Sequence, residues 1–267
     1  MTPLQAELYA LTHRGNAGDR ELYARVCAGA RRVLELGAGY GRLLPTLAAE
    51  RREVVGVELD PALRALARRS LAQRAALAAR VRVVAGDMRS FALGERFDRV
   101  VIPHSGIYCL LDRGGVIGCL RSAREHLADG GRVVFDAYAA DAFHAESSPR
   151  DVSHDALEPV VSVSCRGDVW DVFEQSRWFK RERRIDATYV YAPRRRGRAQ
   201  TITIRQRYLL TSELRALLGR AGLELVALRA GFGPRRARAS EHWVVEARAA
   251  ELSARRQPRA ATRAARR

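Results

Sequence analysis

The chain has 267 residues, enough for one large domain or one domain with an insertion, and its hydrophobic content of 47% is sufficient for a core. It contains no apolar run of about 18 residues, which excludes a predicted membrane-spanning helix. Its first residues lack a signal-peptide pattern, and its four cysteines lack metal-type spacing. We therefore expect a cytoplasmic protein without a bound metal.

The formal net charge of +17 raises the question of nucleic-acid binding. Only Lys180 among the 47 basic residues is a lysine, and such an excess of arginine, with much alanine, is typical of a GC-rich genome. Residues 251–267 hold six arginines against the single acid Glu251 and lack apolar periodicity, which predicts a disordered basic tail. We favour composition over nucleic-acid binding as the source of the charge.

The first 30 residues predict short helices that precede the main domain. Residues 4–12 have weak helical character, and residues 13–18 form a loop with two glycines and an asparagine. Asp19 is suited to cap a helix over residues 20–28. We expect this N-terminal segment to act as a lid.

Strands and helices then alternate strictly. The predicted strands cover residues 32–36, 53–58, 81–85, 97–103 and 132–136, and the predicted helices begin near Gly41, run from Pro61 to about 79, and span 113–128. Asp60 followed by Pro61 is a helix start signal, a cap before a proline at the first helical position. The alternation predicts an α/β domain with a parallel sheet.

The pattern changes after the fifth strand. Residues 159–210 consist of alternating runs rich in Val, Thr, Tyr, Phe and Trp, which predicts an antiparallel β meander. Thr211 can cap a helix over 212–220, and residues 223–228 and 241–247 predict two last strands, paired antiparallel at the sheet edge. The predicted fold is a doubly wound, Rossmann-like seven-stranded sheet over residues 31–250, with the meander inserted after strand five.

Chemistry-bearing residues follow four of these strands. Strand one contains Glu35 and runs into a turn with Gly37, Gly39 and Gly41, which lets a ligand approach the backbone closely. Strand two ends at Glu58, about 20 residues further on, where an acid can accept hydrogen bonds from a ribose. The segments 86–88 and 103–106 follow strands three and four. Ligands bind beyond the carboxyl ends of such strands, so these segments are expected to border one site.

The order of the segments 33–42, 56–61, 86–89, 97–101 and 127–134 resembles that of class I S-adenosylmethionine-dependent methyltransferases over roughly residues 30–137, and the final strands extend the likeness. The resemblance implies S-adenosylmethionine as cofactor. The implied cofactor-binding residues are Glu35, Gly37, Ala38, Gly39, Glu58, Leu59, Asp87, Met88 and Pro103.

The resemblance also implies a role for each part of the set. The segment 37–39 would pack under the methionine part, and Glu35 would meet its ammonium group. Glu58 would hold the ribose, with Leu59 against the adenine. The next segment would read the adenine, with the Asp87 carboxylate accepting from its amino group and the Met88 amide donating to a ring nitrogen. Each of these roles has a structural alternative. The three glycines could serve only a tight strand–helix turn, Glu58 could be a surface acid, and Asp87 could cap the segment that follows it.

A base is needed only where the acceptor must lose a proton. His104, in the loop after strand four, is the best placed candidate for this base, and Tyr108 is the second. Alternatively, His104 is a loop histidine without a role in proton transfer, and Tyr108 is a core residue. Tyr9 and His13 on the N-terminal lid are the candidates for substrate binding, or else ordinary surface residues.

The loop after strand four lacks the motifs of amino-directed DNA, cytosine C5 and protein-arginine methyltransferases. The layout resembles glycine/sarcosine-type and amino-sugar N-methyltransferases, which implies N- or O-methylation of a small molecule, with the meander as acceptor cover or homodimer face. One alternative is an RNA or other nucleic-acid methyltransferase that uses the arginines of 180–198 and 235–238. The other is a non-enzymatic cofactor-binding relative.

Overall fold

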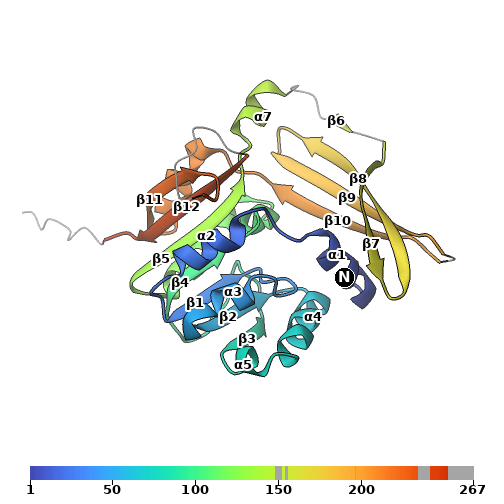
Figure 1. Ribbon diagram of the computed structural model, residues 1–267. Coiled ribbons are helices and arrows are strands. Elements are labelled where there is room, and N and C mark those ends of the chain that lie inside the picture. The colour runs from blue at the N-terminus through green and yellow to red at the C-terminus, as the bar shows by residue number, and fades with distance from the viewer. Residues whose placement is uncertain (148–151, 154–155, 196, 234–240, 252–267) are drawn as a thin grey trace, which may run out of the picture.

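The computed structural model contains two β-sheets, with the N-terminal helix between them (Figure 1). It describes residues 1–147, 152–153, 156–195, 197–233 and 241–251. The larger sheet has seven strands in the order β11-β12-β5-β4-β1-β2-β3. These strands are β1 (Arg32–Leu36), β2 (Glu53–Glu58), β3 (Val81–Ala85), β4 (Phe97–Ile102), β5 (Leu127–Tyr138), β11 (Leu223–Ala230) and β12 (His242–Ala249).

The first five strands of this sheet are parallel, and β12 runs antiparallel to both β5 and β11. The predicted doubly wound sheet with an antiparallel pair at its edge is therefore confirmed. The central strands β1 and β4 are apolar because helices cover both of their faces, as parallel sheets require. Leu34 and Val100 accordingly have no exposed surface.

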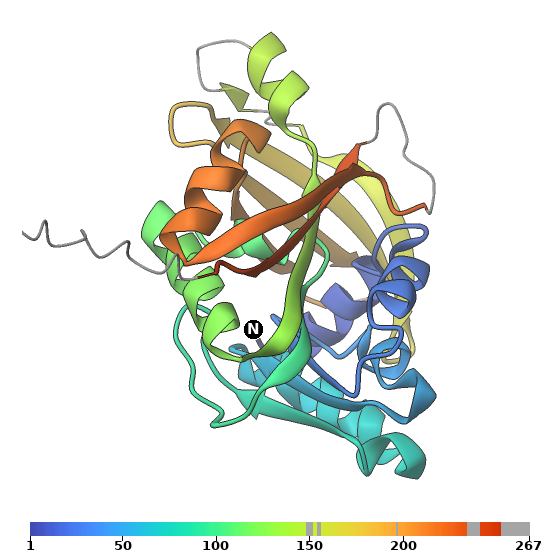
Figure 2. The ribbon, with the colours of Figure 1, turned by 90° about the vertical axis from the view of Figure 1, so that its left-hand side faces the viewer.

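Helices cover the two faces of the large sheet. α2 (Asp19–Val26), α3 (Leu44–Leu47) and α4 (Pro61–Ala72) pack on one face, around a core that includes Val33 and Val54. α6 (Arg113–Glu125) and α8 (Leu214–Arg220) pack on the other face, and in Figure 2 both lie on one side of the long strand β5, with α2 on its other side. The remaining helical segments are short: η1 (Ala49–Arg51), α5 (Ala75–Ala78), η2 (Gly106–Cys109), α7 (Asp141–Glu146) and η3 (Thr211–Glu213).

Several predicted helix boundaries were wrong, three of them by three residues or more. The helix after the glycine turn is a single turn that begins at Leu44 rather than Gly41, because Gly41 has a φ of +82° and sits tightly against Leu44 and Ala67. The helix predicted to reach residue 79 ends at Ala72, and a short second helix, α5, follows a non-helical Arg74. The helix predicted to reach residue 128, α6, ends at Glu125. Strand β5 begins two residues later, at Leu127, and so includes Gly130, which adopts a φ of +72°.

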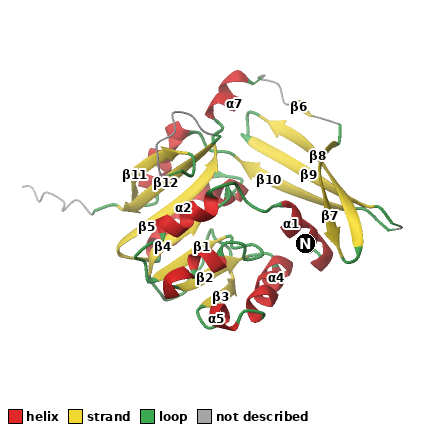
Figure 3. Ribbon diagram, in the orientation of Figure 1, coloured by secondary structure: helices red, strands yellow, loops and turns green. Residues whose placement is uncertain are grey.

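The second sheet is the predicted meander. β7 (Glu158–Cys165), β8 (Asp168–Phe179), β9 (Arg184–Pro193) and β10 (Gln200–Arg207) pair antiparallel in chain order, and the short β6 (Val152–Ser153) also pairs with β8 (Figure 3). α1 (Pro3–Thr12) lies between this sheet and α4. Leu8 of α1 is fully buried in a small core with residues of the meander, including Trp170 and Tyr191.

None of the described helices is long and apolar enough to span a membrane. The basic tail predicted at 251–267 lies, apart from Glu251, outside the described residues, as do the arginines at 235–238.

Candidate active site

The turn after β1 leaves open space at the carboxyl ends of the strands. Its amide groups Gly37 N and Ala38 N both donate to the carbonyl oxygen of Val57, at 2.9 and 3.0 Å, which ties the turn to β2. Gly37 and Gly39 adopt φ angles of +69° and +56°, a conformation that other residues reach only with strain. A Cβ atom on Gly39 would meet no atom within 4 Å, and one on Gly37 would meet only the Met88 sulfur at 3.9 Å. The backbone therefore offers a ligand a cradle that side chains would fill.

Glu35 is a buried acid beneath this cradle. Its side chain lies in β1 with 3% exposure, and its Oε2 has no hydrogen-bond partner among the described residues. Burial raises the pKa of the Glu35 carboxyl to about 8, against the opposing charge of Arg42. A cationic group bound nearby would favour the charged carboxylate. An ammonium group, such as that of S-adenosylmethionine, fits this position.

Glu58 locks the glycine turn to the end of β2. Its Oε2 accepts from the Gly39 amide and its Oε1 from the Asp60 amide, both at 2.7 Å. Burial raises the pKa of Glu58, although these two hydrogen bonds oppose the shift. Each carboxylate oxygen keeps a second lone pair, so the group can still accept from two hydroxyls.

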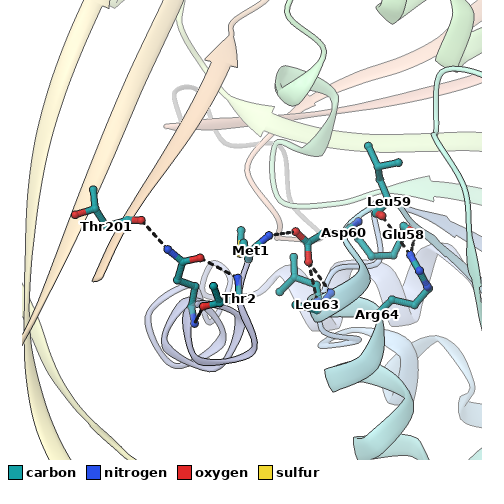
Figure 4. Close-up of polar contacts among 10 residues, drawn as sticks. Met1, Thr2, Glu58, Leu59, Asp60, Leu63, Arg64 and Thr201 are labelled. Atoms are coloured by element: carbon teal, nitrogen blue, oxygen red, sulfur yellow. Dashed lines mark hydrogen bonds and ion pairs between the residues drawn. The ribbon is translucent and has the colours of Figure 1, made fainter. Parts of the chain in front are cut away.

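The turn that follows β2 presents an apolar side chain. The Arg64 guanidinium donates to the carbonyl oxygens of Glu58 and Leu59, at 3.0 and 3.2 Å, and holds this turn in place (Figure 4). The Leu59 side chain is 64% exposed and points away from Arg64. An exposed leucine beside a carboxylate that can accept from two hydroxyls suits contact with the flat face of a base.

Asp87 and Met88 follow β3, and the Asp87 carboxylate is hydrogen-bonded to Arg89. The Asp87 carboxylate accepts from the Arg89 amide at 2.9 Å and pairs with the Arg89 guanidinium at 2.6 Å. These hydrogen bonds lower the pKa of Asp87. An adenine amino group at this carboxylate would share it with Arg89. The Met88 side chain is half-buried and packs against the large core beside Gly37.

The His104 loop has a strained backbone held by strand β5. His104 and Ser105 both adopt a φ of +55°, which is unusual for two successive residues other than glycine. The His104 amide donates to Asp136 Oδ1 at 2.9 Å, and the Tyr138 amide donates to Ser105 Oγ at 3.2 Å. Asp136 has no exposed surface, and it also accepts from the Tyr23 hydroxyl of α2 at 2.5 Å. The loop shape thus depends on β5 and α2 together.

The His104 ring is neutral at physiological pH. Burial lowers its pKa to about 4, with a further contribution from the charge of Arg42. Its Nδ1 is buried without a hydrogen-bond partner among the described residues. A neutral ring of this kind can accept a hydrogen bond from an acceptor, but it is a weak base.

Tyr108 lies in a different setting from His104. Its side chain is fully buried in η2, and its hydroxyl lies 2.9 Å from the carbonyl oxygen of Tyr138 and 3.3 Å from that of Leu209. Because its proton is engaged by backbone oxygens, Tyr108 is less suited to proton transfer than His104. Pro103 is buried at the end of β4, next to the His104 loop.

Asp19 and Arg42 form a buried ion pair that connects α2 to the glycine turn. The Arg42 guanidinium donates to both carboxylate oxygens of Asp19, at 3.0 and 2.6 Å, and the two side chains are 9% and 2% exposed. The capping role expected for Asp19 was wrong, because Gly18 occupies the N-cap and Asp19 is the first helical residue. The pair places a positive charge near Glu35 and His104.

Helix α1 brings the two lid candidates over the strand ends. The Tyr9 and His13 rings stack with centroids 4.2 Å apart, and the Tyr40 hydroxyl of the glycine turn donates to the His13 carbonyl at 2.8 Å. At the other end of α1, Gln5 Nε2 donates to the Thr201 carbonyl at 3.1 Å, and the Met1 amino group meets Asp60 Oδ2 at 2.6 Å (Figure 4). The N-terminal segment is therefore held by β10 and by the loops that follow β1 and β2.

Asp136 is a residue of this region that sequence reasoning missed. It ends an apolar run, Val133-Val134-Phe135-Asp136, in the same way that Glu58 ends strand two. That signal, an acid at the carboxyl end of a buried strand, was available.

Comparisons with known proteins agree with the fold. A family model described as a methyltransferase domain matches residues 33–131. The structure is similar to the CcbJ methyltransferase of Streptomyces caelestis, at 28% identity and a TM-score of 0.73, over 87% of this chain and 89% of that one. It is also similar to the sugar N-methyltransferase KedS8 of a Streptoalloteichus species, at 25% identity and a TM-score of 0.67, over 90% and 92% of the two chains.

A third similar structure is the glycopeptide N-methyltransferase MtfA in complex with S-adenosylmethionine. It has 28% identity and a TM-score of 0.59, over 88% of this chain and 95% of that one. No curated protein sequence matches the chain significantly.

The seven-stranded sheet, the glycine cradle and these similarities define a methyltransferase fold with a site for a nucleoside-containing methyl donor. The chain is therefore an S-adenosylmethionine-dependent methyltransferase with the class I fold, and S-adenosylmethionine is its methyl donor.

Proposed function

We propose that this methyltransferase acts on a small molecule, at nitrogen or oxygen, in the recess between the ends of β1, β2 and β4 and the inner face of the meander. The observation that carries the proposal is the position of α1. The helix contacts α4 on one side and β7 and β10 on the other, so it covers the strand ends at the place where an acceptor would meet the donor. A recess closed in this way suits a compact acceptor better than a nucleic-acid duplex. The relatives described as sugar and glycopeptide N-methyltransferases support the same acceptor class.

The donor-side residues divide into two groups in this proposal. Glu35 binds the ammonium of the methionine part, over the cradle of residues 37–39, and its unpartnered Oε2 supports the assignment. Glu58 binds the two ribose hydroxyls, and Leu59 covers one face of the adenine.

The remaining donor-side residues lie at the adenine end and beside the reacting group. Asp87 accepts from the adenine amino group in competition with Arg89, and the Met88 amide donates to the ring. Pro103 forms part of the wall next to the His104 loop.

S-adenosylmethionine supplies an activated methyl group attached to a positively charged sulfur. An acceptor atom with a free lone pair would take the methyl group as the carbon–sulfur bond breaks toward sulfur, which would leave a neutral thioether. The proton lost from the methylated nitrogen or oxygen would pass to water, directly or through the His104 hydrogen bond. The protein contributes alignment and exclusion of water. His104 accepts a hydrogen bond from the acceptor, and Tyr9 and His13 close the recess above it.

The experiment is methyl transfer from S-adenosylmethionine with a labelled methyl group. Small-molecule amines and alcohols are compared with single-stranded and duplex RNA at low salt. Incorporation into a small molecule, without RNA binding, is the expected result. Labelled RNA, with binding that weakens steeply as salt rises, would favour the nucleic-acid alternative instead.

A further inference from the structure

The inner face of the meander carries a polar belt between two apolar regions. Side chains alternate across a strand, and the pairing of β8, β9 and β10 defines which of them share this face. Towards one end, the face is apolar and packs against α1. At the other end, Trp178 and Ile185 join the core of the large domain. Between these regions lie Glu174 and Ser176, and Gln206 lies opposite Ile185 where the second region begins; all three are half-buried.

Polar residues on an inward face need a reason, because burying them without partners costs free energy. Ser176 Oγ donates to Glu174 Oε1 at 2.8 Å. Tyr189 lies opposite Glu174 in the strand pairing and hydrogen-bonds its carboxylate. The chain has 47 basic residues, so most acids could find a basic partner. Among the described residues, however, Glu174 forms no salt bridge. Glu174 is therefore a half-buried negative charge that no arginine neutralises there.

The belt faces the lid and the methyl-donor side of the recess. The His13 ring lies edge-on to the Tyr189 ring at 4.7 Å, and Glu174 is close enough for its charge to act on His13. His13 Nε2 is buried with no hydrogen-bond partner in the part of the chain that the structure describes. The ring stacked on His13 is Tyr9, which projects from α1 towards Tyr40.

Gln206 connects the belt to η2. Its side chain hydrogen-bonds the thiol of Cys109. Cys109 is exposed. Desolvation nevertheless raises the pKa of its thiol to about 11, and the charge of Glu58 acts in the same direction. Cys109 is therefore close enough to Glu58 for their charges to interact, which places Gln206 on the donor side of the meander.

We propose that Glu174 is the specificity-determining residue that binds the methyl acceptor, and that it selects an acceptor carrying an amine. The carboxylate accepts hydrogen bonds from the ammonium form, and the Tyr9, His13 and Tyr189 rings flank it, as aromatic faces commonly flank bound cations. If this nitrogen is the one methylated, the ammonium must first release a proton to water, which gives the nitrogen its lone pair. Gln206 hydrogen-bonds a neutral polar group of the same acceptor. This inference rests on the proposed function, because it places the acceptor in the same recess.

The test measures binding directly, in the presence of S-adenosylhomocysteine, by saturation-transfer NMR. The probes are two matched pairs, glucosamine with glucose and tyramine with tyrosol, so that each amine has a neutral counterpart. We expect at least one amine to bind and its counterpart to bind much more weakly. Glu174→Gln should weaken amine binding roughly 10- to 100-fold, because a charge-assisted hydrogen bond is lost.

Two controls separate recognition from folding. Glu182→Gln removes a more exposed carboxylate from the β8–β9 connection of the same sheet and should leave amine binding within about twofold. S-adenosylhomocysteine affinity and thermal unfolding should be unchanged in Glu174→Gln, and Glu174→Asp should restore part of the amine binding. Equal binding of amine and neutral counterpart, no binding of any amine at millimolar concentration, or an unchanged Glu174→Gln would each overturn the role of Glu174.

The same samples distinguish this inference from the proposed function. Methyl transfer to an alcohol, with no preference for amines, would remove the amine inference and keep the small-molecule methyltransferase. Glu174-dependent amine binding, together with methyl transfer to RNA alone, would remove the proposed function and keep the amine site.

Discussion

The buried carboxylate of Asp136 accepts a hydrogen bond from the backbone amide of His104 at 2.9 Å. The same oxygen accepts from the Tyr23 hydroxyl at 2.5 Å, so one side chain of β5 joins α2 to the loop that follows β4. This relationship holds His104 and Ser105 in left-handed backbone conformations at the edge of the recess.

Removing this acceptor should destabilise the protein. We expect Asp136→Ala to lower the free energy of unfolding by roughly 2–3 kcal/mol, because a buried amide is left without a partner. Asp136→Asn retains an oxygen acceptor and should cost less. Urea unfolding measures both changes, and hydrogen exchange should show a faster His104 amide in Asp136→Ala. Identical losses in the two variants would mean that the hydrogen bond is not what holds the loop.

Glu35 should make the ligand-free protein less stable as the pH rises. Its pKa is about 8 in the folded protein against an ordinary value of 4.5, so the folded form retains a proton that the unfolded chain releases between these values. Stability should therefore fall between about pH 4.5 and 8, by on the order of 4 kcal/mol from this group. Burial also raises the pKa values of Glu58 and Asp136, which adds to the decline. Glu35→Gln should flatten the profile measured by thermal or urea unfolding, whereas a profile of unchanged slope would contradict the assignment.

Binding of S-adenosylmethionine should release the proton held by Glu35, because a nearby ammonium group lowers the pKa of the carboxyl. At pH 7, calorimetric binding enthalpies should then depend on the ionisation enthalpy of the buffer. The dependence should be smaller in Glu35→Gln. If the wild type and the variant show the same dependence, Glu35 does not contact the donor.

Glu58 should be essential for donor binding. Glu58→Ala removes a carboxylate that we assign to two ribose hydroxyls, and we expect the affinity for S-adenosylmethionine to fall by at least about 100-fold. Glu53→Ala, at the exposed opposite end of β2, is the control and should bind normally. Calorimetry gives both affinities, and thermal unfolding shows whether each variant is folded. Unchanged affinity in a folded Glu58→Ala protein would refute the site.

Two glycines with the same strain should differ in function. Gly39 and Gly29 have φ angles of +56° and +74°, and a Cβ atom on either would meet nothing within 4 Å. Each change to alanine should therefore cost about 1 kcal/mol of stability from the backbone alone. Only Gly39→Ala should reduce donor affinity, because its methyl group would occupy the cradle. Equal affinities of the two variants would show that the donor does not approach Gly39.

The sequence by itself determined the α/β alternation, the glycine turn and the acids at the ends of strands one and two. These features depend on local spacing: a buried strand, a turn that needs glycine, and an acid about 20 residues later. The methyl donor could be predicted from them, because residues that end neighbouring parallel strands must meet at one edge of the sheet.

The tertiary structure decided what surrounds that donor. Asp19 forms an ion pair with Arg42 instead of capping the helix that it begins. Asp136 accepts hydrogen bonds from Tyr23 of α2 and from the His104 amide in the loop after β4. Glu174 faces the recess only because β8 pairs with β9 in one particular register, and a shift of one residue would turn it outward. Such contacts join residues far apart in the chain, and no local pattern encodes them. The residues that surround the proposed acceptor can therefore be identified only in the folded protein.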